Sequence, residues 1–483
     1  MIVSQKLRKR VTHPTRLAFT IATTTSPETV TIPTSSTGTY GCNIDWGDGN
    51  TTVVTAWNSL QLTHTYATAG SYSIKIDGVF TNLPYNASFR FKYVSGDLLV
   101  KNTMFNAIAA FRGSSNLTSM NVNFDLTGTT DMTSTWQGCT GLTTFPIIKT
   151  QDITEGRQAW NGCSGLTAFP VLDFSSMISL SLTWSGCTGL TSFPNIPMPQ
   201  LDRCNSAWQG CTGLTTFPAL NIPTVTDIGN AWAGCTGLTS FLVMPFPNVT
   251  NFGAAWQGCT GLINFPSINF PSGTSGISAW AGCTSLAGFP NINVGSSDLR
   301  FAWDGCISLT SFPLIDFSTA TSLSGTWRNC SSLTSFPLID ISSTNSITVA
   351  WSGCSGLTSF PLIDTSAVTA FIQTWFGCSS LTSFPALNLL AGTNFSNAWD
   401  GCTSLITFPP NMFDTCLGTN FTLAWNNCAL DVTSVNNILI SLDTAGQSNG
   451  TLDMAGGTSA TPTGAGVAAK NNLIAKGWGV TTN

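Results

Sequence analysis

The sequence predicts a mainly β protein whose largest part is a parallel solenoid with turns of about 24 residues. Three observations carry this prediction. Thirteen tryptophans recur at nearly constant spacing, and each is followed by Cys, Leu and Phe-Pro at fixed offsets. Gly, Pro, Ser and Thr interrupt every unit too often for a helix. Because 42% of residues are apolar and only 8% are charged, the chain can bury a large core under a polar, nearly uncharged surface.

The first segment, residues 1–17, is a basic arm. Residues 1–27 contain five basic side chains and no acid, so they carry +5 while the rest of the chain carries −10. We interpret Lys6, Arg8, Lys9 and Arg10 as a docking segment for an acidic partner, with plain disorder as the alternative. The arm does not indicate nucleic-acid binding, because the acidic body would be repelled.

The apolar run that follows the arm is short. Residues 17–22 include Thr20 and fall far below the roughly 18 residues of a membrane span. A Pro and a Thr-rich stretch flank this run, so we expect neither membrane insertion nor a cleavable secretion signal.

Residues 18–81 are predicted to form a small antiparallel β-sandwich. The run Asn43–Gly49 places an Asp-Gly turn directly after a strand, and residues 70–76 alternate cleanly between apolar and polar side chains. Residues 82–110, including the alternating run Phe89–Tyr93, are predicted to be connecting strands.

Residues 111–430 contain the repeat, which reads W-x-G-C-x-x-L-T-x-F-P-x-φ-[DN]-φ. Ten of the twelve spacings between tryptophans are 24 residues, and the exceptions are 23 and 26. An imperfect forerunner with Phe111, Ser114, Leu117 and Met120 lies 25 residues upstream of the first unit. We expect the strand at the φ-[DN]-φ segment. The repeating tryptophans are Trp136, Trp160, Trp184, Trp208, Trp232, Trp256, Trp280, Trp303, Trp327, Trp351, Trp375, Trp399 and Trp425.

A unit of this length cannot bury its own apolar face and must stack on its copies. Equivalent residues then form columns, and the Trp, Leu and Phe columns are predicted to be core. Thirteen of the sixteen cysteines form one column. We predict that these are reduced, buried, small apolar residues, because a single-file line does not suit a metal site and parallel Cβ vectors oppose disulfides.

Two columns are predicted to face outward and could bind a ligand. One is the hydroxyl column before each Phe, which could meet glycans or ice; ordinary strand surface is the alternative. The other contains Asp316, Asp340 and Asp364 in consecutive turns, where stacked carboxylates could hold Ca²⁺ or could each bind local backbone as turn residues do. No other cofactor is expected. The hydroxyl column includes Thr144, Ser192, Thr216, Ser311, Ser335 and Ser359.

Residues 431–483 break the repeat and are predicted to form an αβ cap over the last apolar turn. Thr433 or Ser434 should cap a helix that ends near Leu442. A strand at residues 451–454, a helix at residues 465–475 and a final strand at residues 478–481 should follow.

The repeat resembles the BspA-type leucine-rich repeat, with Trp at a position where that family usually has Phe. The segment with Asp45-Trp46-Gly47-Asp48-Gly49, His64, Tyr66 and Tyr72 resembles a PKD domain, an immunoglobulin-like sandwich. Together they are similar to BspA-family surface proteins, often adhesins, and to phage virion proteins that use the same modules. The resemblance implies attachment and supplies no catalytic residues.

Catalytic chemistry is not indicated by the residues themselves. The two histidines, His13 and His64, lie outside the solenoid, and no nucleophile–base set or phosphate-binding loop can be assembled. We therefore predict a non-enzymatic protein.

The leading hypothesis is a phage virion fibre or decoration protein that attaches to a host or surface glycan or protein. It would contact other virion proteins through the arm or the PKD-like domain. The alternatives are a BspA-type adhesin on the bacterial cell surface and an ice-binding solenoid. The virion hypothesis depends on the expected lack of an export signal.

Overall fold

The structure is a computed structural model, and it places most of the 483 residues. The arm residues Lys6, Arg8, Lys9 and Arg10 lie outside the part it describes. The described residues are 16–32, 34, 36, 38–80, 91–95, 107–115, 117–121, 126, 129–295 and 298–483.

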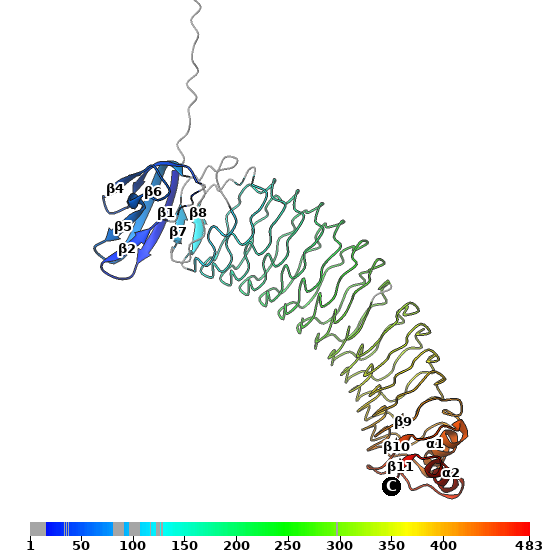
Figure 1. The fold of residues 1–483 in the computed structure, drawn as a ribbon. Helices are drawn as coiled ribbons and strands as arrows, with labels where there is room; N and C mark the ends of the chain where they lie inside the picture. Colours follow the sequence, from blue (N-terminus) through cyan, green and yellow to red (C-terminus); the bar gives the residue numbers. More distant parts are fainter. Residues whose placement is uncertain are drawn as a thin grey trace, which may run out of the picture. The chain divides into compact units, whose positions relative to one another are not determined.

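Two compact units make up the chain. Unit 1 comprises Met1–Met177 with Cys187–Leu190, and unit 2 comprises Ile178–Gly186 with Thr191–Asn483. Unit 1 therefore holds the N-terminal strands and the first solenoid turns, and unit 2 holds the remaining turns and the C-terminal elements (Figure 1).

The N-terminal strands of unit 1 form two sheets. In the larger sheet, β3 (Tyr40–Asp45) lies between β4 (Thr51–Val54) and β6 (Gly70–Phe80), and β6 also pairs antiparallel with β1 (Arg16–Thr23). The smaller sheet pairs β2 (Glu28–Thr31) with β5 (Thr63–Tyr66), and the short 3-10 helix η1 (Leu60–Leu62) precedes β5. The side chains of Ile44, Trp46, Val54, Tyr66 and Ile74 are buried among these strands. Two sheets around one apolar core fit the predicted sandwich.

One strand links the sandwich to the repeats. Strand β7 (Phe91–Ser95) pairs antiparallel with β1 and parallel with β8 (Ser119–Asn121). It falls within the segment predicted to hold connecting strands, of which residues 81–90 and 96–106 lie outside the described part. The larger sheet therefore runs on into the first, imperfect turn of the solenoid.

The solenoid turns themselves are not built from regular strands. Between β8 and β9 (Asn420–Phe421), the described residues form turns joined by isolated parallel bridges. Most bridges lie five residues before each Trp, as in Asp227↔Asn251. The strand predicted at φ-[DN]-φ was therefore wrong. The preceding Pro has no N–H to donate, and the Asp side chain itself accepts the N–H two residues further on, so the ladder is interrupted there.

The backbone around each Trp carries the regular hydrogen-bond ladder between turns. The N–H groups of Asn230, Trp232 and Gly234 donate to carbonyl oxygens of the next turn at 2.9, 2.8 and 2.7 Å. The residue two before each Trp has a left-handed backbone, with φ of 56° at Asn230 and 52° at Val349. This tight bend recurs in every turn and lets alternate N–H groups face the neighbouring turn.

Aromatic rings fill the interior of both units. In unit 1, Phe111 stacks on Trp136 at 6.2 Å between centroids, and Trp136 stacks on Trp160 at 5.1 Å. In unit 2, successive Trp rings from Trp184 to Trp425 stack at 5.0–6.3 Å, with interplanar angles of at most 13°. The predicted Trp, Leu and Phe core columns are confirmed by their burial.

The cysteine column has a role beyond filling space. All sixteen cysteines are free and buried, and this was predicted for the thirteen of the column. Each thiol of the column donates a hydrogen bond to the backbone carbonyl of the aromatic residue in the preceding turn. Cys235 Sγ, for example, lies 3.1 Å from the Trp208 oxygen. The same carbonyl also accepts the backbone N–H of the Cys three residues on, as Trp208 does from Cys211 at 3.1 Å, so it binds one N–H and one S–H donor.

The C-terminal elements close unit 2 (Figure 1). Helices α1 (Val432–Ala445) and α2 (Gly464–Ala475) pack together, and β10 (Thr451–Asp453) pairs parallel with both β9 and β11 (Gly479–Thr481). The sequence predicted these four elements within a few residues. The N-cap of α1 is Asp431, whose carboxylate accepts the N–H of Ser434 at 2.7 Å. Thr433 and Ser434 were predicted for that role, but both lie inside the helix.

Candidate functional site

The predicted hydroxyl column lies on the surface. Thr144, Ser192, Thr216, Ser311, Ser335 and Ser359 are all exposed, one per turn. The residue just before each is usually Thr, and its hydroxyl is used internally: Thr358 Oγ1 donates to the Thr334 carbonyl at 3.2 Å. The two hydroxyl columns therefore differ. The Thr hydroxyls form hydrogen bonds between neighbouring turns, whereas the hydroxyls of the predicted column face solvent.

The predicted aspartate column is also exposed. Asp316, Asp340 and Asp364 each accept, through Oδ1, the N–H of the serine two residues on, at 2.9 Å. Hydrogen bonds from Ser318 hold the pKa of Asp316 below its usual range, and hydrogen bonds from Ser342 do the same for the pKa of Asp340. The three carboxylates are turn residues, each bound to the backbone of its own turn.

The calcium site predicted at these three aspartates is not supported. Within the described residues, the structure has no group of three or more acidic, His or Cys side chains placed to hold a metal ion. The geometric reason is that each Asp is bound to its own turn. One oxygen of each carboxylate already accepts a backbone N–H, and the three side chains do not converge on a common point.

A third outward column was missed in the sequence. Leu314, Leu338 and Leu362 lie two residues before the three aspartates, and their exposed fractions are 61, 64 and 63%. These are large apolar side chains left in solvent in three consecutive turns. The signal that could have revealed them is the octapeptide Leu-Thr-Ser-Phe-Pro-Leu-Ile-Asp, which occurs three times, at residues 309–316, 333–340 and 357–364.

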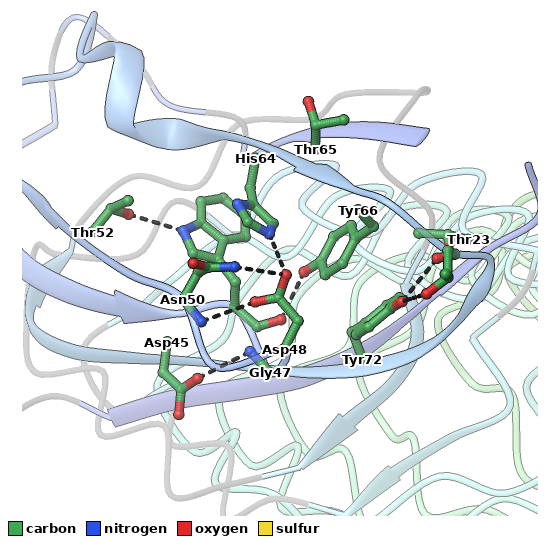
Figure 2. Close-up of polar contacts among 12 residues, drawn as sticks. Thr23, Asp45, Gly47, Asp48, Asn50, Thr52, His64, Thr65, Tyr66 and Tyr72 are labelled. Carbon is green, nitrogen blue, oxygen red and sulfur yellow. Dashed lines mark hydrogen bonds and ion pairs between the residues drawn. The ribbon is translucent and has the colours of Figure 1, made fainter. Parts of the chain in front are cut away.

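The N-terminal sandwich holds a separate polar and aromatic cluster (Figure 2). His64 stacks on Trp46 at 4.9 Å between ring centroids and meets the edge of Tyr66 at 4.7 Å. The Tyr66 hydroxyl donates to the Trp46 carbonyl at 2.8 Å, and burial raises the pKa of this phenol. The residues that carry the PKD resemblance therefore lie together in space.

Asp48 ties this cluster to its turn. Its carboxylate lies 2.7 Å from His64 Nε2 and accepts the Asn50 backbone N–H at 3.0 Å. Burial raises the pKa of Asp48, but the hydrogen bonds from His64 and Asn50 outweigh it, so the pKa lies below its usual range. Gly47 has φ of +78°, and a Cβ there would lie 2.5 Å from the Ser73 carbonyl. The hydrogen bonds and ring contacts of this cluster all join residues of the sandwich to one another. The cluster therefore holds the turn at residues 47–50 in place.

No family model and no curated protein matches the chain. No helix in the described residues is long and apolar enough to cross a bilayer.

Three of the similar solved structures are bacterial proteins, and their overall similarity to this chain is low. A leucine-rich cell surface protein from Faecalibacterium prausnitzii A2-165 has 18% identity and a TM-score of 0.37, over 80% of this chain and 94% of its own. A leucine-rich repeat protein from Eubacterium ventriosum has 13% identity and a TM-score of 0.31, over 66% and 85%. An internalin from Listeria monocytogenes has 16% identity and a TM-score of 0.24, over 57% and 76%. These scores are too low to support an inference about function.

Proposed function

We propose that the protein is a non-enzymatic attachment protein whose solenoid presents an extended surface to a glycan or protein on a cell or other surface. The observation that carries the proposal is the regular outward display of the same chemistry in turn after turn. Ser311, Ser335 and Ser359 stand in one exposed column, and the exposed leucine and aspartate columns run beside it. A surface that repeats with the turn can contact a partner at many weak points at once.

The finer identity follows from the residues. The clustered residues of the N-terminal sandwich resemble those of a PKD domain, and the Trp-x-Gly-Cys units resemble BspA-type repeats. We propose that the chain combines these two modules. A combination of a sandwich and a repeat array suits a protein that is held at one end and binds along its length.

The place of action is proposed to be the virion of a phage, as a fibre or decoration; the surface of a bacterium is the alternative. Antibody against the purified chain, used for gold labelling in electron microscopy, distinguishes them. Label on tailed particles supports the virion. Label on the envelope of intact cells, with none on particles, contradicts it.

Binding can be tested with the full chain and matched variants. A fluorescent form would be applied to candidate host cells and to glycan and protein arrays. The triple variant Ser311→Arg, Ser335→Arg and Ser359→Arg should lower binding at least about tenfold, because three long charged side chains would cover the hydroxyl column.

Ser343→Arg is the control, since Ser343 is exposed but lies outside that column. Circular dichroism would verify that both variants fold. Equal binding by the wild type and the triple variant would remove the hydroxyl column as the contact surface. Failure of the wild type to bind any of these targets would contradict attachment itself.

A further inference from the structure

One stretch of unit 2 exposes apolar and acidic side chains side by side. Over three consecutive turns, Leu314, Leu338 and Leu362 form an exposed row, and Asp316, Asp340 and Asp364 form a second row two residues further along each turn. We call these six residues the Leu–Asp face. In the Phe column just before this face, the rings of Phe312, Phe336 and Phe360 lie 5.8 and 6.3 Å apart between centroids.

The face lacks a cation of its own. From residue 301 to residue 469 the sequence has nine acids and a single base, Arg328. That guanidinium is already held by Asp304, 2.6 Å from its carboxylate, and lies over the Phe301 ring at 5.1 Å. Among the described hydrogen bonds, each carboxylate of the face is bound only by the serine two residues further on. Like charges in adjacent turns repel, so a cationic partner would be stabilised there.

Each turn of the face has the chemistry that complements one Lys or Arg side chain. Such a side chain has an apolar stem and a charged head, and the stem packs on apolar surface while the head reaches a polar group. A leucine with a carboxylate two residues beyond offers both contacts, about 6.6 Å apart along the chain. A glycan would match the carboxylates and hydroxyls but would leave three leucines in contact with polar groups. The partner is therefore a basic segment of a protein.

We propose that the basic arm of a second copy of this chain binds the Leu–Asp face. The arm contains Lys6, Arg8 and Arg10 at alternate positions and no acid. In an extended strand, alternate side chains are spaced about 6.6 Å apart, close to the separations of the Phe rings in these turns, so three basic side chains would meet three successive turns. The arm thereby acquires a specific acidic partner. Each copy of the chain carries both the basic arm and the Leu–Asp face that binds it.

A contact between different surfaces of identical chains is heterologous, and it builds rings or open chains. The proposal can be tested apart from the external ligand, because the peptide experiment below contains no cells and no glycan or protein array. Attachment can fail while the arm still binds, and the reverse also holds.

The first experiment uses a fluorescent peptide of residues 1–15 and the protein without residues 2–12, with binding followed by fluorescence anisotropy. We expect saturable binding that weakens at least about tenfold in the triple variant Asp316→Asn, Asp340→Asn and Asp364→Asn. Asn fits this turn, because Asn388 already occupies the same position and accepts the Leu390 N–H at 3.2 Å. Binding should also weaken when salt is raised, because the contact is ionic.

Three controls define the contact. Asp173→Asn changes an exposed aspartate of the same column, which makes the same turn with Ser175 at 3.0 Å, and should leave binding unchanged. Leu314→Ser, Leu338→Ser and Leu362→Ser together should weaken binding, whereas Val243→Ser in an earlier turn should not. A peptide of the same composition with its basic residues grouped should bind more weakly than the native sequence.

The second experiment measures the mass of the intact chain by analytical ultracentrifugation over a range of concentrations. The wild type should associate as its concentration rises, and both the arm deletion and the triple Asp variant should remain monomeric. Equal association in all three would overturn the proposal and place self-contact elsewhere. A peptide that binds the triple Asp variant as well as the wild type would overturn it too, as would a lack of peptide binding.

Discussion

A single hydrogen bond explains why cysteine recurs in every turn. The Cys thiol fills a small buried space and donates to the carbonyl of the Trp in the preceding turn, as Cys354 does to Trp327 at 3.1 Å. Alanine would fill the space without donating, and serine would donate but lose apolar contact. The thiol meets both needs at once.

Burial should make these thiols unreactive in the native protein. It raises the pKa of Cys163, Cys235 and Cys354 to about 12, so almost no thiolate forms at pH 8. We expect Ellman's reagent to label few of the sixteen cysteines in the folded chain and all of them in guanidinium chloride. Rapid labelling of many thiols without denaturant would contradict the buried column.

The same shift makes stability depend on pH. A thiol whose pKa is higher in the folded state keeps its proton there, while the unfolded chain loses it above its ordinary pKa of about 8.5. The stabilisation is thus complete below about pH 8.5 and is lost progressively up to about pH 12. The urea midpoint should fall as pH rises from 8.5 to 10. Returning the pH to 8.5 is the control and should restore the midpoint, because ionisation of a thiol is reversible.

Backbone strain at Val349 predicts a stabilising substitution. Its φ of 52° lies in the left-handed region, which costs a β-branched residue about 1–2 kcal/mol. Asn tolerates this region and occupies the same position at Asn230 and Asn397. Val349→Asn should therefore raise the free energy of unfolding by about 0.5–1 kcal/mol. The reverse change, Asn397→Val, should lower it, and urea denaturation would measure both.

At the scale of the elements, the indole column buries a large apolar surface but leaves indole N–H groups without hydrogen-bond partners. Within the described residues, the indole N–H of Trp208 and of every repeat Trp after it has no hydrogen-bond partner. A buried donor without a partner costs free energy, so ring stacking and burial must outweigh that cost. The stability of the interior therefore depends on the size and shape of the indole ring and not on its N–H group.

Substitutions in this column should separate the two contributions. Trp232→Ala should lower the free energy of unfolding by about 3–5 kcal/mol, because it leaves a large cavity. Trp232→Phe should cost less than about 2 kcal/mol, since it removes an unpaired donor together with part of the ring. Phe111 already fills this column and stacks on Trp136. Trp57→Ala is the control, as Trp57 is 47% exposed and should change stability little.

The core columns and the C-terminal elements could be predicted because their signals are periodic or follow helix and strand propensity. The left-handed residue before each Trp could not be predicted, since its side chains range from Ser134 to Leu182 and Phe301. The left-handed conformation is imposed by the hydrogen bonds between neighbouring turns and not by the residue type. The exposed leucines were overlooked because Leu314 and Ile315 are adjacent apolar residues, and both could belong to the core. Only the fold shows that Ile315 is buried and Leu314 is exposed.

At the scale of the whole molecule, a stack of turns must be covered where it ends. Ser434 and Ser441 in α1 accept the N–H groups of Phe408 and Phe413, each at 2.8 Å, and Trp478 stacks on Phe421 at 6.1 Å. These contacts join the C-terminal elements to the last turns of unit 2. The elements thus supply both polar partners and apolar cover to the final turn.

Removing residues 431–483 should therefore expose the last aromatic turn. We expect the shortened chain to aggregate and to unfold at a temperature lower by more than about 5 °C, because apolar surface and backbone N–H groups lose their partners. Light scattering and differential scanning calorimetry would measure both. Deletion of residues 2–12 is the control and should leave the unfolding temperature unchanged.

The stack of nearly parallel indoles in unit 2 also has an optical consequence. Rings held 5.0–6.3 Å apart in a fixed orientation are close enough for their excited states to couple and to pass excitation along the row. Excitation absorbed by one ring should therefore be emitted from another ring of the row, and the transfer should depolarise the emission little because the ring planes are nearly parallel. Substitution of Phe for one Trp in the middle of the row would interrupt this transfer of excitation and leave two shorter rows of coupled indoles.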